Sequence, residues 1–361
     1  MRIKPISLAV LLSCSLILNV QASQEEVPAL NYSQSAQLIR DTYERELFTL
    51  PPFKEGHFGL RMFRQTLDEK YYATIWTDMA QVASRLNRFA NDVVKPEDII
   101  LYSSERLTRY QEKEDERSQR RYTVTKHHPE YLYLGVDLLG AMARADEYGL
   151  KHQQDKTLRE IIRRYDFTRY ATDKEMIEAW AAQLANQVYW LGEQDVVNAF
   201  IEAFRATYPD DNDKKLSAQQ YGNKIYGMTH IIFADSQYYQ KRVNEADHQW
   251  IYDYFRDNID TILLRAKEDI IAEVGISFLL AGLDHDPVVE KTRQAIRDAI
   301  STEQGMIPSV DGDFDLKYGE HRNVLAIMLL DWKGVHKAPT YQAHPKAFKS
   351  LPYGLVPKSP K

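Results

Sequence analysis

The chain has little of what several protein classes depend on. Its 361 residues include one cysteine, Cys14, together with 15 glycines and 14 prolines. A lone cysteine excludes a disulfide within the chain and any cysteine-cluster metal site. The scarcity of glycine and proline argues against a β-rich fold with many tight turns. Basic residues are a minority, with 46 Lys and Arg against 52 Asp and Glu, so we expect neither a general nucleic-acid binder nor a protein that adheres to membrane surfaces.

Motifs that identify a particular chemistry are also missing. The sequence has no HExxH pair, no complete EF-hand loop, no phosphate-binding glycine loop and no GxSxG nucleophile elbow. We therefore expect no metal ion and no cofactor. Any catalysis must come from ordinary acid, base and charged side chains.

The N-terminus has the features of a cleaved signal peptide. Arg2 and Lys4 precede an apolar stretch over residues 6–20, and Val20-Gln21-Ala22 offers a cleavage position before Ser23. The stretch is shorter than the roughly 20 apolar residues of a membrane span, so we expect no stable membrane insertion. The predicted mature protein is periplasmic or secreted. A lipoprotein anchored at Cys14 is the less favoured alternative, because the apolar run continues beyond that cysteine.

Helical periodicity dominates the rest of the chain. One class of segments is apolar nearly throughout and predicts buried helices: 132–148, 175–191, 229–239, 270–283 and 321–332. A second class has one charged face and predicts half-exposed helices: 95–110, 156–165, 194–208, 247–266 and 287–300. We interpret the mixed-charge run 112–121 as a solvated helix end or loop.

The buried class recurs every 47 residues. Steps of 47 from Gly135 reach Ala182, Thr229, Ile276 and Asn323, and one step back reaches Arg88. One buried and one amphipathic helix per period is typical of a helical-hairpin repeat. The predicted fold is all-α, an (α/α) toroid of six or seven hairpins, with an open α-solenoid as the alternative. We assign 23–333 to this domain and 334–361 to an extended proline-rich tail.

Two similar clusters of polar residues stand at predicted starts of buried helices. In each, Tyr-Gly is followed within four residues by a histidine. The first cluster is Asn223, Tyr226, Gly227 and His230, and the second is Tyr318, Gly319, Glu320, His321 and Arg322. If the hairpins close, both clusters point toward one central opening, where a binding site is expected.

These residue types suit the cleavage of a uronate polysaccharide by β-elimination. That reaction needs a group to neutralise the sugar carboxylate, a base for the C5 proton and an acid for the leaving oxygen. The candidate catalytic residues are His230, Tyr226, Glu273 and His321. The candidate substrate-binding residues are Asn223, Tyr318, Glu320, Arg322 and Asp235.

The exported helical-hairpin design, with Tyr, His, Asn and Arg at the starts of inner helices, resembles the toroid families of polysaccharide lyases, including periplasmic alginate lyases, over residues 35–333. The resemblance implies a polysaccharide or oligosaccharide partner. It also implies that His230 is the base or the carboxylate partner and Tyr226 the acid. Asn223 and Arg322 would neutralise the carboxylate.

Two other functions remain open. A glycoside hydrolase on the same fold needs two carboxylates that face each other across the funnel, for which Asp137, Asp235, Glu273 and Glu320 are candidates. A carbohydrate-binding or scaffold protein of the cell envelope needs no acid–base pair, because tyrosine side chains can stack on sugar rings without catalysis.

Overall fold

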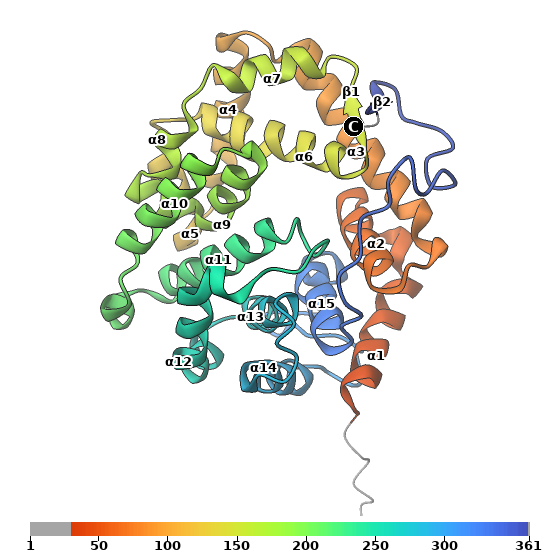
Figure 1. Ribbon diagram of the computed structural model, residues 1–361, viewed down its shortest axis with the longest axis vertical. Coiled ribbons are helices and arrows are strands. Elements are labelled where there is room, and N and C mark those ends of the chain that lie inside the picture. The colour runs from red at the N-terminus through yellow and green to blue at the C-terminus, as the bar shows by residue number, and fades with distance from the viewer. Residues whose placement is uncertain (1–29, 360–361) are drawn as a thin grey trace, which may run out of the picture. The chain divides into compact units, whose positions relative to one another are not determined.

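The computed structural model describes residues 30–359, and the predicted signal peptide with Cys14 lies outside them. The described part is predominantly α-helical, as predicted (Figure 1). Its α-helices are α1 (Tyr32–Arg45), α2 (Pro52–Thr66), α3 (Tyr72–Asp92), α4 (Pro96–Gln111), α5 (Glu116–Thr125), α6 (Leu139–Glu147), α7 (Asp155–Arg163), α8 (Phe167–Ala171), α9 (Lys174–Leu191), α10 (Gln194–Thr207), α11 (Ala218–Asp235), α12 (Gln249–Arg265), α13 (Glu268–Leu280), α14 (Pro287–Asp298) and α15 (Leu316–Leu330). A π-helical segment, η3 (Leu132–Leu138), leads directly into α6. None of the helices within residues 30–359 combines the length and the apolar character that crossing a bilayer requires.

Local signals fix several helix ends. Pro96 and Pro287 occupy the first helical positions of α4 and α14. Gly192 ends α9 with a φ of 73°, a left-handed conformation that glycine adopts without steric cost. Ser217 begins α11 with a capping box in which its hydroxyl accepts from the backbone N–H of Gln220.

The 47-residue period marks helices that are buried and adjacent. The five positions from Gly135 to Asn323 are all buried, in η3, α9, α11, α13 and α15. These helices pack in sequence order, α9 against α11, α11 against α13, and α13 against α15. The period fails one step earlier, because Arg88 in α3 is exposed. From the N-terminal part of the chain, it is instead α1 and α2 that pack on α15.

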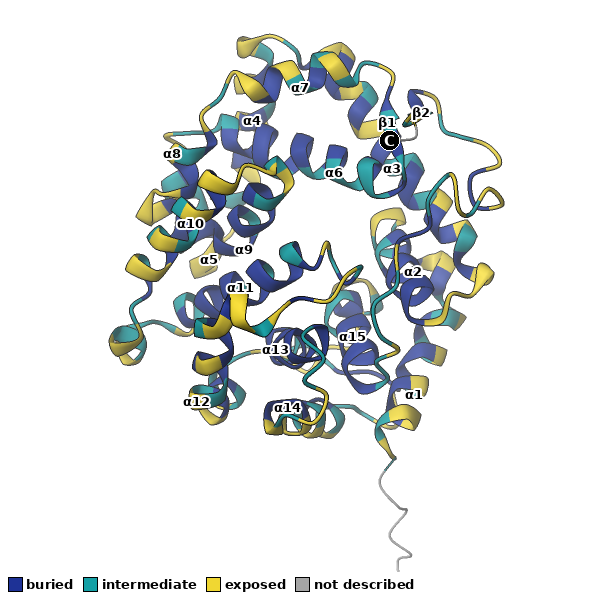
Figure 2. Ribbon diagram, in the orientation of Figure 1, coloured by how far each residue is buried: buried dark blue, intermediate teal, exposed yellow. Residues whose placement is uncertain are grey.

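Burial separates the helices into two classes. From Ile270 to Leu280, every residue of α13 is buried, whereas α10, α12 and α14 each keep an exposed face (Figure 2). These amphipathic helices cover the buried ones: α10 packs on α9, α12 on α11 and α13, and α14 on α13. The hydrophobic effect therefore holds the two helices of each hairpin together. It also holds neighbouring hairpins together, through contacts between their buried helices.

Two predicted boundaries were wrong. The buried helix expected from residue 229 begins at Ala218, so the cluster from Asn223 to His230 lies inside α11 rather than at its start. The segment 112–121, interpreted as a helix end or loop, contains the start of α5. There the Asp115 side chain accepts from the backbone N–H of Ser118, and this N-cap begins a helix within a densely charged run.

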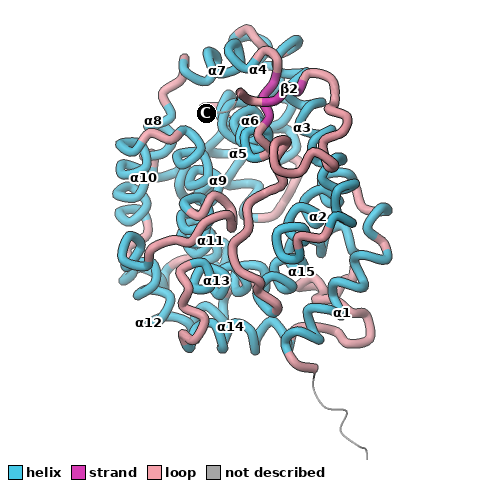
Figure 3. Tube along the Cα trace, turned by 45° about the vertical axis from the view of Figure 1, so that its right-hand side comes forward, coloured by secondary structure: helices cyan, strands magenta, loops and turns pink. Residues whose placement is uncertain are grey.

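The C-terminal segment crosses the surface as a long strap without regular helix from Gly334 to Gly354 (Figure 3). It is fixed by hydrogen bonds to residues far away in sequence. The backbone N–H of Ala338 donates to Gln240 at 2.9 Å, and the Trp76 indole N–H donates to the carbonyl of Ser350 at 2.8 Å. At its end β2 (Leu355–Pro357) pairs antiparallel with β1 (Leu150–His152).

Candidate functional site

Glu273 lies between two of the predicted histidines. It sits in the apolar helix α13 and its side chain is 1% exposed. One carboxylate oxygen, Oε2, accepts from the Thr229 hydroxyl at 2.7 Å. The other, Oε1, lies 3.7 Å from Nε2 of His230 and 3.8 Å from Nε2 of His321. Because α13 packs between α11 and α15, residues 91 positions apart in the sequence meet at one carboxylate.

A third histidine, His57 of α2, joins the group. Its Nδ1 lies 2.5 Å from Oε1 of Glu320, and that carboxylate is fully buried. The other oxygen of Glu320 accepts from the Lys54 ammonium at 3.2 Å. The imidazole of His57 also packs against that of His321, with 5.5 Å between ring centroids. The site thus contains three imidazoles backed by two buried carboxylates.

Burial favours the uncharged form of two of these imidazoles. It lowers the pKa of His57 well below its usual value, with the positive charges of Arg61 and Lys54 acting in the same direction. It lowers the pKa of His321 to about 4, with a further contribution from His57. Burial also raises the pKa of Glu320, which the nearby Lys54 ammonium opposes. At neutral pH the site therefore offers uncharged imidazole nitrogens, which are able to accept protons.

The lowered pKa of His321 predicts a pH-dependent stability. Its folded pKa of about 4 lies below the unfolded value of 6.5, so protons bind more tightly to the unfolded chain. Above pH 7 His321 is uncharged in both states and its titration does not change stability. As the pH falls from 6.5 toward 4, protonation of His321 in the unfolded chain progressively lowers the free energy of unfolding. Urea denaturation measured over this range should show a shallower decline for His321→Gln than for the wild type. Parallel curves for the two proteins would contradict the assignment.

The three histidines line one cavity of about 550 Å³. Its wall also includes Arg61 of α2, Arg144 of α6 and the loop after α11. In that loop Tyr238 stacks on Trp190, with centroids 6.4 Å apart and planes 27° apart. The Tyr238 hydroxyl lies 3.3 Å from Nδ1 of His230.

The backbone that carries Tyr238 is strained. Gln237, Tyr238 and Tyr239 have φ values of 53°, 55° and 71°, a left-handed conformation that costs non-glycine residues roughly 1–2 kcal/mol each. The surrounding structure must hold this turn in place, and strain of this kind concentrates at functional sites. The turn directs Tyr238 against His230 and Trp190.

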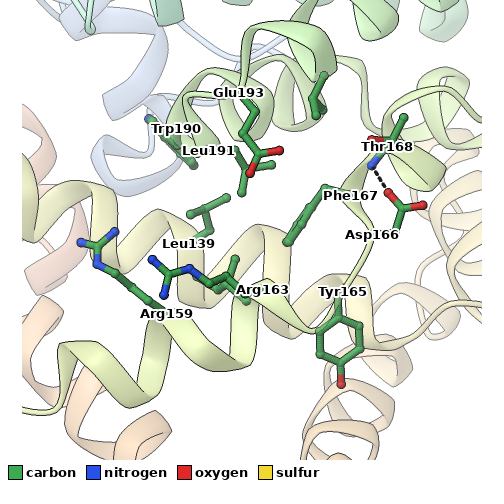
Figure 4. A pocket seen from close by; sticks show the side chains of 12 residues that line it. Leu139, Arg159, Arg163, Tyr165, Asp166, Phe167, Thr168, Trp190, Leu191 and Glu193 are labelled. Atoms are coloured by element: carbon green, nitrogen blue, oxygen red, sulfur yellow. Dashed lines mark hydrogen bonds between the residues drawn. The ribbon is translucent and has the colours of Figure 1, made fainter.

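A second pocket, of about 380 Å³, adjoins the first (Figure 4). Leu139, Arg159 and Trp190 line both. Figure 4 shows Arg159 and Arg163 projecting side by side from α7, with Phe167 of α8 and Glu193 across the opening. The two pockets form neighbouring parts of one depression around Trp190.

Some residues predicted from sequence lie at this site, and others lie elsewhere. His230, Glu273 and His321 meet directly, and Glu320 reaches them through His57. Tyr226 is one helical turn before His230, and its hydroxyl donates to Asp269. Burial raises the pKa of Tyr226 well above its usual value, and Asp269 adds to this shift, so its proton is retained.

The remaining predicted residues have structural contacts outside the cavity wall. The Asn223 amide donates to the carbonyls of Ile177 and Glu178 and so ties α11 to α9. Arg322 donates to the carbonyl of Ile307 at 3.2 Å. Tyr318 is 71% exposed. Asp235 is paired with Lys241 and His248, and Asp137 with Arg106 and Tyr102.

His57 and Arg61 were not predicted from the sequence. A signal for them exists, because Lys54, His57, Arg61 and Arg64 recur at helical spacing of three or four residues. In a helix that buries Phe58, Leu60 and Met62, a stripe of basic residues on the remaining face indicates polar partners inside the fold. Within residues 30–359, no three His, Cys, Asp or Glu side chains are grouped as a metal site.

Comparison with known proteins gives a family and no function. No curated protein and no solved structure matches the chain. The family model described as a domain of unknown function, DUF3541, matches residues 32–358, and the chain therefore belongs to this family.

Proposed function

We propose that the protein is an exported enzyme that cleaves a uronate-containing polysaccharide by β-elimination in the cavity around His57, His230 and His321. The observation that carries the proposal is the His57–Glu320 pair. A buried carboxylate 2.5 Å from one imidazole nitrogen orients the ring and fixes its tautomer, which is how a carboxylate assists a histidine base in many enzymes.

The reaction assigns a task to each group. With Glu320 ionised beside Lys54, the Nδ1–H of His57 donates a hydrogen bond to the carboxylate, and a lone pair stays on Nε2. That nitrogen takes the C5 proton of the uronate, the C4–O bond breaks, and a C4=C5 double bond forms. The leaving oxygen takes the proton of Tyr238, which burial keeps on the hydroxyl by raising its pKa. His230, 3.3 Å away, can return a proton to Tyr238.

Elimination suits the cavity better than hydrolysis does. Inverting and retaining glycosidases need two carboxyl groups that reach the sugar. Glu273 and Glu320 are almost completely buried and contact the imidazoles. Asp146 and Glu147 do line the cavity, but each is paired with an arginine, Asp146 with Arg159 and Glu147 with Arg144.

We also propose that the hairpins close into an (α/α) toroid rather than an open solenoid. The support is the packing of α15 against α2 as well as α13, which returns the succession of buried helices to an early member. An open solenoid would leave its first and last repeats without this contact.

The test is a spectroscopic assay of the purified mature protein against a panel of uronate polymers. Elimination creates a conjugated double bond, so we expect ultraviolet absorbance to rise with time for at least one polymer. Reducing ends that accumulate without this absorbance would show hydrolysis instead. If no polymer gains new reducing ends, the proposal that the protein is a polysaccharide-cleaving enzyme is wrong.

A further inference from the structure

Arg61 is a buried cation that has no anionic partner among residues 30–359. It lies on α2 one turn after His57, is 6% exposed, and lines the cavity. A terminal nitrogen of its guanidinium donates a long hydrogen bond of 3.5 Å to the carbonyl of His57. The Nε of Arg61 has no partner among the described residues. The ring of Tyr239 lies 5.8 Å from the guanidinium carbon.

The neighbouring arginines provide a contrast. Arg144 is paired with Glu147 at 2.9 Å and with Asp78 at 3.5 Å, and Arg64 also pairs with Glu147. Glu273 is bonded to Thr229, and within residues 30–359 no carboxylate lies within ion-pairing distance of Arg61. Burial, together with the charges of Arg144 and Arg61, lowers the pKa of Arg64 to about 9, which reflects local crowding of positive charge.

An unpaired buried charge is costly, and a protein keeps one where something else supplies the counter-charge. A guanidinium presents five N–H donors in a planar fork that matches the two oxygens of a carboxylate. In this cavity the fork lies beside His57, the proposed base. Trp190 and Tyr238 add an aromatic surface, and the ring faces of sugars pack on such surfaces.

We infer that Arg61 binds the carboxylate of an acidic sugar and makes the cavity selective for uronates over neutral sugars. The identification of the ligand as a sugar rests on the proposed function, whereas the need for an anion follows from Arg61 itself. Bound beside His57, the same contact stabilises the negative charge that develops on the carboxylate when the C5 proton leaves.

Uronic acid monosaccharides test this inference separately from catalysis, because they contain no glycosidic bond to cleave. The matched probes are glucuronate and glucose, then galacturonate and galactose, which differ only at the carboxylate. Binding is measured by ligand-observed NMR titration. We expect at least one acid to bind about tenfold or more tightly than its neutral counterpart, the size of one good charge-assisted contact.

Variants locate the contact. Arg61→Gln should remove the preference for the acid, and Arg61→Lys should retain part of it because the charge stays while the fork is lost. Arg164→Gln, which changes an exposed arginine, should bind as the wild type does. Thermal melts show that each variant is folded. If Arg61→Gln fails to fold, the Arg61→Lys variant and the comparison of acid with neutral sugar in the wild type still test whether Arg61 binds the carboxylate.

The outcomes separate this inference from the proposed function. Selective uronate binding without cleavage of any polymer would support Arg61 as the acid-binding residue and remove the lyase chemistry. Equal binding of acid and neutral sugars, or unchanged selectivity in both Arg61 variants, would overturn the inference even if polymer is cleaved. Inorganic sulfate is the last probe, and if it binds as tightly as the uronates, the site is a general oxyanion site and the sugar-acid assignment fails.

Discussion

Replacing His57 with glutamine is expected to lower kcat for polymer cleavage by about 10²- to 10⁴-fold, the usual contribution of a general base. Glutamine preserves a polar side chain of similar reach and can still hydrogen-bond to Glu320. It cannot accept the C5 proton at neutral pH. Since the loss affects the transition state and not the bound substrate, KM should change little. Initial rates from the absorbance assay measure both quantities.

Two further variants make this result specific to the pair. Glu320→Gln keeps the shape of the side chain but removes the charge that orients His57. We expect kcat to fall, but by less than in His57→Gln. Raising the pH should not restore the activity. His285→Gln changes an exposed histidine and should leave kcat unchanged. If His57→Gln keeps the wild-type kcat, His57 is not the base. His321 would then be the next candidate, because it also lines the cavity.

The same substitution, glycine to alanine, should have opposite effects on stability at two helical positions. At Gly227 in α11 an added Cβ would lie 2.3 Å from a ring carbon of Phe204 and 3.0 Å from the Cβ of Ala181. Phe204 is completely buried and has little freedom to move. Overpacking of this kind costs about 1–3 kcal/mol of unfolding free energy.

At Gly140 in α6 the added Cβ would make only an ordinary contact of 3.6 Å with Trp190. Alanine is the better helix former there, so Gly140→Ala should raise the unfolding free energy by about 0.5–1 kcal/mol. Urea denaturation with unchanged m-values would measure both effects. Stabilisation by Gly227→Ala would contradict the close packing of α11 on α9 and α10.

The sequence predicted the helices well because their pattern is local. Apolar spacing repeats within a turn or two of the chain, and it located most helix ends within a few residues. Thr229 was misplaced as a start because the first turns of α11 contain Gln219, Gln220 and Lys224, whose polarity hid the beginning of the helix. Lys224 is in fact fully buried against Asp210 and Asp213.

The site was harder to predict because its partners are distant in sequence. His230 and His321 were found from their similar Tyr-Gly context, and Glu273 was named among the candidate carboxylates. His57 pairs with a residue 263 positions away, and no local pattern encodes such a pairing. Conversely, the glycine of the Tyr-Gly pair at Gly227 marks close helix packing rather than chemistry, and Asn223 ties two helices together.

The packing of α1 and α2 against α15 has a kinetic consequence. The early hairpins can form as soon as they are synthesised, but their contact with α15 waits until nearly the whole chain is available. Contacts between such distant parts of a chain raise its contact order and slow folding. Until α15 arrives, the surface around His57 that it covers stays open to water, and partly folded chains that expose such surfaces are prone to aggregate or to bind chaperones.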